Sequence, residues 1–195
     1  MLRYVSVLCG DLDAEITAEV YLLNENAAPP TDGKLLDRVV KDLRYGGYYR
    51  IPLSHDFAIP EGSRIGVVVT QRVKTGDGVK FAIPYAISTG AKHMEDCNLL
   101  FDGNPESGKY SVGHISQGES FVYQGGQWYD WANVIDDLKE GNEQAQYFEY
   151  DNLGIKLYAY SMAELDELHD FAETVPYHGS DMAVCSECSY SVVRP

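Results

Sequence analysis

Alternation of apolar and polar positions is the clearest pattern along the chain. Residues 48–53 (YYRIPL) alternate in this way, as a strand with one buried face requires. A proline-glycine corner (IPEG) follows, and residues 65–69 are then rich in β-branched side chains, which suit a pleated sheet. We therefore expect two antiparallel strands whose core-facing residues are Ile51, Leu53, Val67 and Val69.

The same pattern recurs between turn-rich segments, without any internal repeat. Strands are predicted at residues 3–8, 15–23, 48–53, 65–73, 79–84, 120–123 and 155–160. Many short strands separated by Gly, Pro, Asn and Asp favour an antiparallel arrangement over alternating βαβ units. The predicted fold is mainly β, an antiparallel β-sandwich of jelly-roll or lectin-like type.

Two regions depart from this pattern. Residues 88–118 are long, polar and glycine-containing, which indicates a functional surface excursion or a partly disordered segment. Residues 161–173 (SMAELDELHDFAE) space their apolar residues three apart behind a possible N-cap serine, which predicts a short C-terminal helix. Residues 174–195 are expected to form a linker or an extra edge element. We thus expect a sandwich domain over 2–160 and a helix and tail over 161–195.

The acidic charge balance narrows the choice of partners. Thirty acidic residues against 15 Lys and Arg give a formal net charge of -15, which repels nucleic acid and anionic lipid. No segment has the roughly 20 apolar residues of a membrane span, and the opening residues do not resemble a signal peptide. Because the sequence opens directly in a strand pattern, we expect it to be a fragment of a longer chain.

The four cysteines favour no particular chemistry. Cys185 and Cys188 form a C-x-x-C pair, whereas Cys9 and Cys97 stand alone, so a four-thiolate zinc site lacks its second pair. A redox C-x-x-C normally opens a helix after a strand, and that context is missing. We interpret the pair as ordinary thiols in a tail, and the thiol or disulfide state of all four stays open.

Candidate catalytic residues are equally sparse. His93 and Cys97 lie four residues apart in a polar loop without a catalytic frame, and the other histidines (His55, His114, His169 and His178) occur singly. The sequence has no G-x-S-x-G, no H-E-x-x-H and no phosphate-binding glycine loop. We expect a protein that is not an enzyme.

No cofactor is expected, although a calcium site stays open as an alternative. Asp102, Asn104 and Glu106 alternate like the start of a calcium loop, but Ser107 stands at the position of its glycine and Gly113 at that of its bidentate acid. An EF-hand is therefore excluded. A nonstandard site in this loop, or at Asp136, Asp137 and Glu140, competes with the interpretation of solvated acidic surfaces.

Aromatic residues gather in residues 116–135 (SQGESFVYQGGQWYDWANVI). A glycine turn exposes its neighbours, and rings beside a carboxylate suit sugars or peptide side chains. In a sandwich one of two nearby tryptophans is usually buried, and we expect this of Trp128. The predicted binding surface consists of Tyr123, Tyr129, Asp130 and Trp131.

In their order, several of these segments resemble one known family. They are RYVSVL, AEVYLL, GKLL, GGYYRIPLSHDFAIPEGSRIGVVVT, GESFVYQGGQWYDW and NLGIKLYAY, spanning roughly residues 2–160. The series resembles the lectin-like β-sandwich domain that follows the catalytic domain in some bacterial, exported papain-like cysteine peptidases. The catalytic cysteine and histidine of the peptidase have no counterpart here, and the acidic tail after residue 160 lies outside the match.

The resemblance implies an accessory domain of a secreted or cell-surface bacterial protein, located outside the cell. Its expected partners are a carbohydrate or surface protein and the neighbouring domains of the parent chain. Fold alone does not assign function, so a structural spacer that orients a catalytic domain is the alternative. An independent hydrolase built on His93 and Cys97 is the least favoured hypothesis.

Overall fold

The computed structural model describes residues 1–89, 113–160 and 169–195. The chain forms two compact units, one of residues 1–82 and 155–195 and the other of residues 83–154. Most of the expected long loop and C-terminal helix, together with His93, Cys97, Asp102, Asn104 and Glu106, lie outside the described residues. The sandwich expected over 2–160 is therefore interrupted by the second unit.

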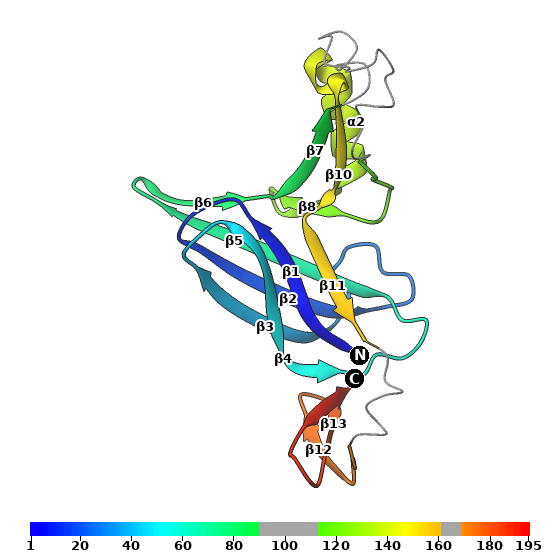
Figure 1. The fold of residues 1–195 in the computed structure, drawn as a ribbon. Helices are drawn as coiled ribbons and strands as arrows, with labels where there is room; N and C mark the ends of the chain where they lie inside the picture. Colours follow the sequence, from blue (N-terminus) through cyan, green and yellow to red (C-terminus); the bar gives the residue numbers. More distant parts are fainter. Residues whose placement is uncertain (90–112, 161–168) are drawn as a thin grey trace, which may run out of the picture. The chain divides into compact units, whose positions relative to one another are not determined.

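The first unit is built from strands (Figure 1). They are β1 (Leu2–Cys9), β2 (Ala14–Leu23), β3 (Gly33–Leu43), β4 (Gly47–Phe57), β5 (Ile65–Thr75), β6 (Gly78–Ala82), β11 (Ile155–Ala159), β12 (Glu173–Tyr177), β13 (Ser180–Val184) and β14 (Ser191–Arg194). A six-stranded sheet has the order β11-β1-β4-β14-β13-β12, and a four-stranded sheet has the order β3-β2-β5-β6. All pairings are antiparallel except a short parallel one between β14 and β4.

The inner faces of these two sheets supply one hydrophobic core. Val5 and Val7 of β1 and Ile16, Ala18 and Val20 of β2 are completely buried, because alternate residues of each strand point inward. Burying each larger side chain contributes roughly 1.5–3 kcal/mol. The predicted inward residues belong to this core: Ile51 and Leu53 are buried, and Val67 and Val69 pack against it. The predicted antiparallel β-sandwich is confirmed.

The C-terminal strands extend the first sheet at its edge. Val192 and Val193 of β14 pair in parallel with Asp56 and Phe57 of β4, and the N–H of Ala58 donates to the carbonyl of Val193 at 2.7 Å. Residues 174–195, expected as a linker or an edge element, thus contribute edge strands. They belong to the first unit because β14 pairs with β4.

A half-buried ion pair between Arg3 and Asp56 holds this extension in place. The Arg3 guanidinium on β1 donates to both carboxylate oxygens of Asp56 on β4, through Nε at 3.0 Å and Nη2 at 2.6 Å. The Tyr190 hydroxyl, which precedes β14, also donates to Asp56 and accepts from Arg3 at 2.9 Å. Burial and the Asp56 carboxylate raise the pKa of Tyr190 to about 12. Three distant segments are therefore joined at one carboxylate.

The second unit combines two strand pairs with a helix. It contains β7 (Tyr85–Thr89), β8 (Phe121–Gln124), β9 (Gln127–Asp130), α2 (Trp131–Gly141), the 3-10 helix η1 (Glu143–Tyr147) and β10 (Phe148–Leu153). β7 pairs with β10, and β8 pairs with β9. Its own core is formed by Trp131 and Ile135 of α2 with Tyr150 of β10. The helix α2 was not predicted from the sequence.

The two ends of this second unit are joined. The backbone N–H of Gly154 donates to the carbonyl of Pro84 at 3.1 Å. The chain thus enters the unit beside the point at which it leaves, as is typical of an inserted segment.

Candidate functional site

A tight hairpin carries the exposed aromatic residues of the second unit. β8 and β9 are joined by Gly125 and Gly126, whose φ angles of 60° and 91° lie in the left-handed region. A two-residue turn with both φ positive matches the twist of an antiparallel hairpin and selects glycine. Gln124 and Gln127 flank this turn as the last cross-strand pair.

Tyr123 and Trp128 form the next cross-strand pair of the hairpin. Their ring centroids lie 5.1 Å apart with the planes tilted by 56°, an arrangement that aromatic pairs favour. Tyr123 is 59% exposed, whereas Trp128 is half-buried. The hairpin therefore presents an aromatic pair on one face, whereas the exposed Gln124 and Gln127 lie on the opposite face.

Tyr129, a predicted site residue, is paired with Val122, so it occupies the other face of the hairpin. The ring remains exposed, and the side-chain amide of Gln127 donates to its hydroxyl. Val122 packs against the hydrophobic core of the second unit. Tyr129 therefore lies near the pair but on the opposite face of the ribbon.

Asp130 has a structural role at the start of α2. One carboxylate oxygen accepts from the N–H of Ala132 at 3.0 Å and the other from the N–H of Gly118 at 2.6 Å. This is N-capping, which satisfies a helix donor that would otherwise lack a partner. Both oxygens of this predicted binding residue are thus engaged within the protein.

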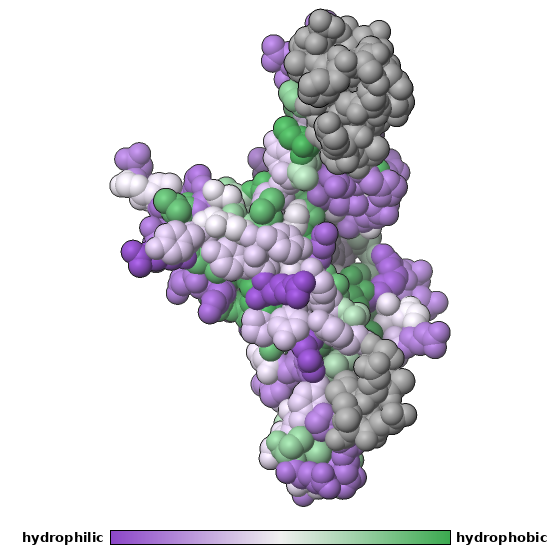
Figure 2. All heavy atoms as spheres, in the orientation of Figure 1, coloured by the Kyte–Doolittle hydropathy of each residue, from purple (hydrophilic) through white to green (hydrophobic). Residues whose placement is uncertain are grey.

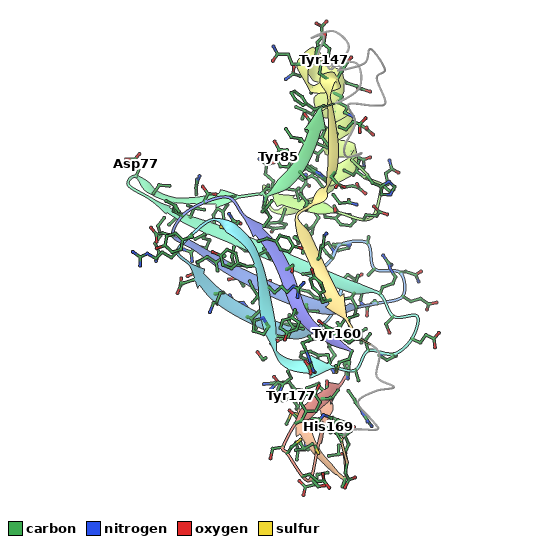
Figure 3. The ribbon with its side chains drawn as sticks, in the orientation of Figure 1. Asp77, Tyr85, Tyr147, Tyr160, His169 and Tyr177 are labelled. Atoms are coloured by element: carbon green, nitrogen blue, oxygen red, sulfur yellow. The ribbon has the colours of Figure 1, made fainter. Side chains whose placement is uncertain are left out.

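The burial expected of Trp128 is found at Trp131, and Trp128 is half-buried. Trp131 was expected on the surface but is only 7% exposed, and its indole N–H donates to the carbonyl of Asp151 at 3.2 Å. Its ring lies 5.4 Å from that of Tyr85, which Figure 3 labels on β7. The expectation was wrong because the chain becomes helical at Trp131, so strand alternation no longer sets the direction of its side chain.

Sequence reasoning left Trp128 out of the site. A signal for it was present in the Gly-Gly turn, because a two-residue turn fixes the register of the strands beside it. That register places Trp128 opposite Tyr123. The structure thus keeps Tyr123 in the candidate surface and adds its cross-strand partner.

The first unit presents a second aromatic surface that the sequence did not indicate. The Arg50 guanidinium lies 4.7 Å from the centre of the Tyr158 ring, and Tyr48 is exposed nearby on β4. Figure 2 shows this outer face of β1, β4 and β11 mainly in lilac and purple, the colours of hydrophilic residues.

Candidate metal ligands converge in the C-terminal part of the chain, and not at the calcium sites considered from the sequence. Asp136, Asp137 and Glu140 are exposed on α2, and no cluster of ligand atoms forms around them among the described residues. Gly113 lies against the backbone of Tyr150, where an added Cβ would come within 2.3 Å of the carbonyl oxygen. In the described part of the chain, the ligand atoms that gather belong to His169, Cys185 and Cys188.

The helices within the described ranges are too short or too polar to cross a bilayer. No known protein family, curated protein or solved structure matches the chain, so the resemblance to the lectin-like domain rests on the order of its sequence segments alone.

Proposed function

We propose that the chain is a non-catalytic binding module that holds neutral carbohydrate against the Tyr123–Trp128 pair. The observation that carries this proposal is the exposure of Tyr123 in a cross-strand aromatic pair beside a two-residue turn. A solvent-facing ring that has already been ordered by its neighbour loses little conformational entropy when a ligand binds.

The chemistry beside the rings suits a sugar. Apolar C–H faces of a sugar pack on aromatic rings, while its hydroxyl groups need both donors and acceptors. The Tyr123 hydroxyl can both donate and accept, and the Trp128 indole N–H can donate. Proteins are the second ligand class expected from the sequence.

Charge favours a neutral ligand. The formal net charge of -15 disfavours approach of sulfated, phosphorylated or sialylated glycans. Asp130 is occupied by backbone donors, so it does not add a carboxylate contact for a cationic ligand.

A glycan array with the intact chain, followed by titration of the best neutral ligand, tests this proposal. Tyr123→Ala should weaken binding by at least about tenfold, or about 1.4 kcal/mol. Tyr45→Ala is a matched control, because Tyr45 is 60% exposed, close to the 59% of Tyr123, and lies in the first unit. The control should bind like the wild type.

Two results would contradict the proposal. Unchanged affinity of Tyr123→Ala for a glycan that the wild type binds would remove the hairpin as the contact surface. Failure of the folded wild type to retain any neutral glycan would favour the structural spacer instead. Placement in an exported bacterial protein, beside a peptidase domain, is part of the same proposal and is supported by the ordered segments of the sequence.

A further inference from the structure

His169, Cys185 and Cys188 converge at the C-terminal end of the first unit. Their possible ligand atoms, one imidazole nitrogen and two sulfurs, all lie within 4.8 Å of one another. The Cys188 Sγ lies 3.3 Å from the His169 Nδ1. Figure 3 labels His169 beside the C-terminal strands.

The turn between β13 and β14 sets the positions of both sulfurs. The N–H of Cys185 donates to the carbonyl of Tyr190 at 2.8 Å, and the N–H of Ser189 donates back to the carbonyl of Cys185 at 3.1 Å. Ser189 adopts a φ of 60°, which reverses the chain within this short segment. The C-x-x-C pair is therefore held in a closed turn.

A separate segment brings the imidazole to this turn. The N–H of Ser186 donates to the carbonyl of Asp170 at 2.9 Å, and its hydroxyl donates to the Asp170 carboxylate at 2.9 Å. These bonds fix the residue next to His169. The histidine ring stacks on Tyr190, with centroids 4.5 Å apart and the planes 25° from parallel.

The thiolate is the form of cysteine that binds metals. Cys185 is buried, whereas Cys188 is exposed, so an ion could enter from the Cys188 side.

We propose that His169, Cys185 and Cys188 bind a zinc-class divalent cation. Two thiolates and an imidazole are the donor set that borderline-soft Zn²⁺ prefers over hard cations such as Mg²⁺ or Ca²⁺. Neighbouring ligands of a tetrahedral zinc ion lie about 3.5–3.8 Å apart, given Zn–S and Zn–N distances near 2.3 and 2.0 Å. The separations within 4.8 Å need only small side-chain rotations to reach this geometry.

Water supplies the fourth ligand, because Cys188 faces solvent. Binding displaces the proton from each thiol that is not already ionised, and His169 Nδ1 binds with its lone pair. The ion would lock the β13–β14 turn onto the segment that contains His169 and Asp170. This inference is independent of the aromatic hairpin, which belongs to the other unit.

Titration of the reduced, metal-free chain with Co²⁺ tests the proposal, because tetrahedral cobalt reports its ligands by absorption. We expect one ion per chain and a thiolate-to-cobalt charge-transfer band, with Zn²⁺ displacing the cobalt. Cys188→Ser and His169→Gln should each lower the affinity more than about tenfold. Cys9→Ala and His178→Gln are the matched controls, and each should bind like the wild type.

Thermal unfolding with and without Zn²⁺ distinguishes loss of metal binding from loss of the fold in the variants. Zn²⁺ should raise the unfolding temperature of the wild type and of the controls, but not that of Cys188→Ser, whose exposed side chain can change without disturbing the core. The absence of a charge-transfer band in the wild type would overturn the proposal. So would wild-type affinity in His169→Gln, or a Cys185–Cys188 disulfide that persists in reductant.

Discussion

Replacing Arg3 with methionine should destabilise the first unit, because it leaves the Asp56 carboxylate without its cation. The Asp56 side chain is only 10% exposed, while that of Arg3 is 33% exposed. Breaking a buried ion pair costs about 3–5 kcal/mol, whereas exposed pairs contribute about 0–1 kcal/mol. Between these limits, and with the Tyr190 hydroxyl still donating to Asp56, we expect a loss of roughly 2–4 kcal/mol in the free energy of unfolding.

A double-mutant cycle separates the ion pair from lost packing. Asp56→Leu leaves a guanidinium that can still reach water, so it should cost less than Arg3→Met. The double variant contains no unpaired buried charge, and its loss should therefore be smaller than the sum of the single losses by at least about 1.5 kcal/mol.

Urea unfolding followed by far-UV circular dichroism measures these losses, and fluorescence supplies an internal control. Both tryptophans of the chain, Trp128 and Trp131, lie in the second unit. The urea midpoint of the tryptophan fluorescence transition should be unchanged in all three variants. The urea midpoint of the circular dichroism transition should shift to lower concentration. A coupling energy below about 0.5 kcal/mol would refute the assignment of Asp56 as a buried, charge-paired group.

Three further predictions concern the phenol, the tryptophans and catalysis. The pKa of Tyr190 is raised to about 12, so its stabilising effect is present below the unfolded value near 10 and is lost as pH rises from about 10 through about 12. Urea midpoints of the wild type should fall more across this window than those of Tyr190→Phe, and parallel curves would contradict the hydrogen bond. Trp131→Ala should cost roughly 3–5 kcal/mol in the second unit, whereas Trp128→Ala should cost clearly less; equal losses by thermal denaturation would show that both rings are core. The pure chain should not cleave casein, and cleavage abolished by Cys97→Ser would reveal a missed catalytic pair.

The strands of the sandwich could be predicted where one face is buried and the other is solvated. In β4 and β2 this leaves a period of two in the sequence, and the predicted segments match the observed ones to within a few residues at their ends. β3 was missed because its register shifts opposite Val20 and Tyr21. Leu36 is the extra residue at this shift, and the consecutive residues Leu36 and Asp37 are both buried, which breaks the alternation.

The helix α2 did leave a signal in the sequence. Asp130 is a favourable N-cap, and Trp131, Val134, Ile135 and Leu138 follow at helical spacing. Aromatic enrichment before the helix favoured the interpretation as strand and turn, so Trp131 was assigned to the surface. The strand-and-turn pattern and the helical pattern overlap in this segment, and only the burial of Trp131 in the structure distinguishes them.

The meeting of His169 with Cys185 and Cys188 could not be predicted from spacing. It depends on how the β13–β14 turn closes and on hydrogen bonds from Ser186 to Asp170. Neither contact produces a periodic pattern. A C-x-x-C pair with one distant histidine therefore looks like three unrelated residues until the chain is folded.

The hydrogen bond from Gly154 to Pro84 has a consequence for the order in which the chain folds. β11 must return to β1 across an intervening segment of about 70 residues, and closing so long a flexible loop costs more entropy than closing a short turn. If residues 83–154 fold first, their joined ends replace that loop by a short connection, which lowers the closure cost by about 2–3 kcal/mol. Early folding of the second unit would then speed the folding of the first unit. Destabilising the second unit should slow the pairing of β11 with β1 without removing any contact from the sandwich.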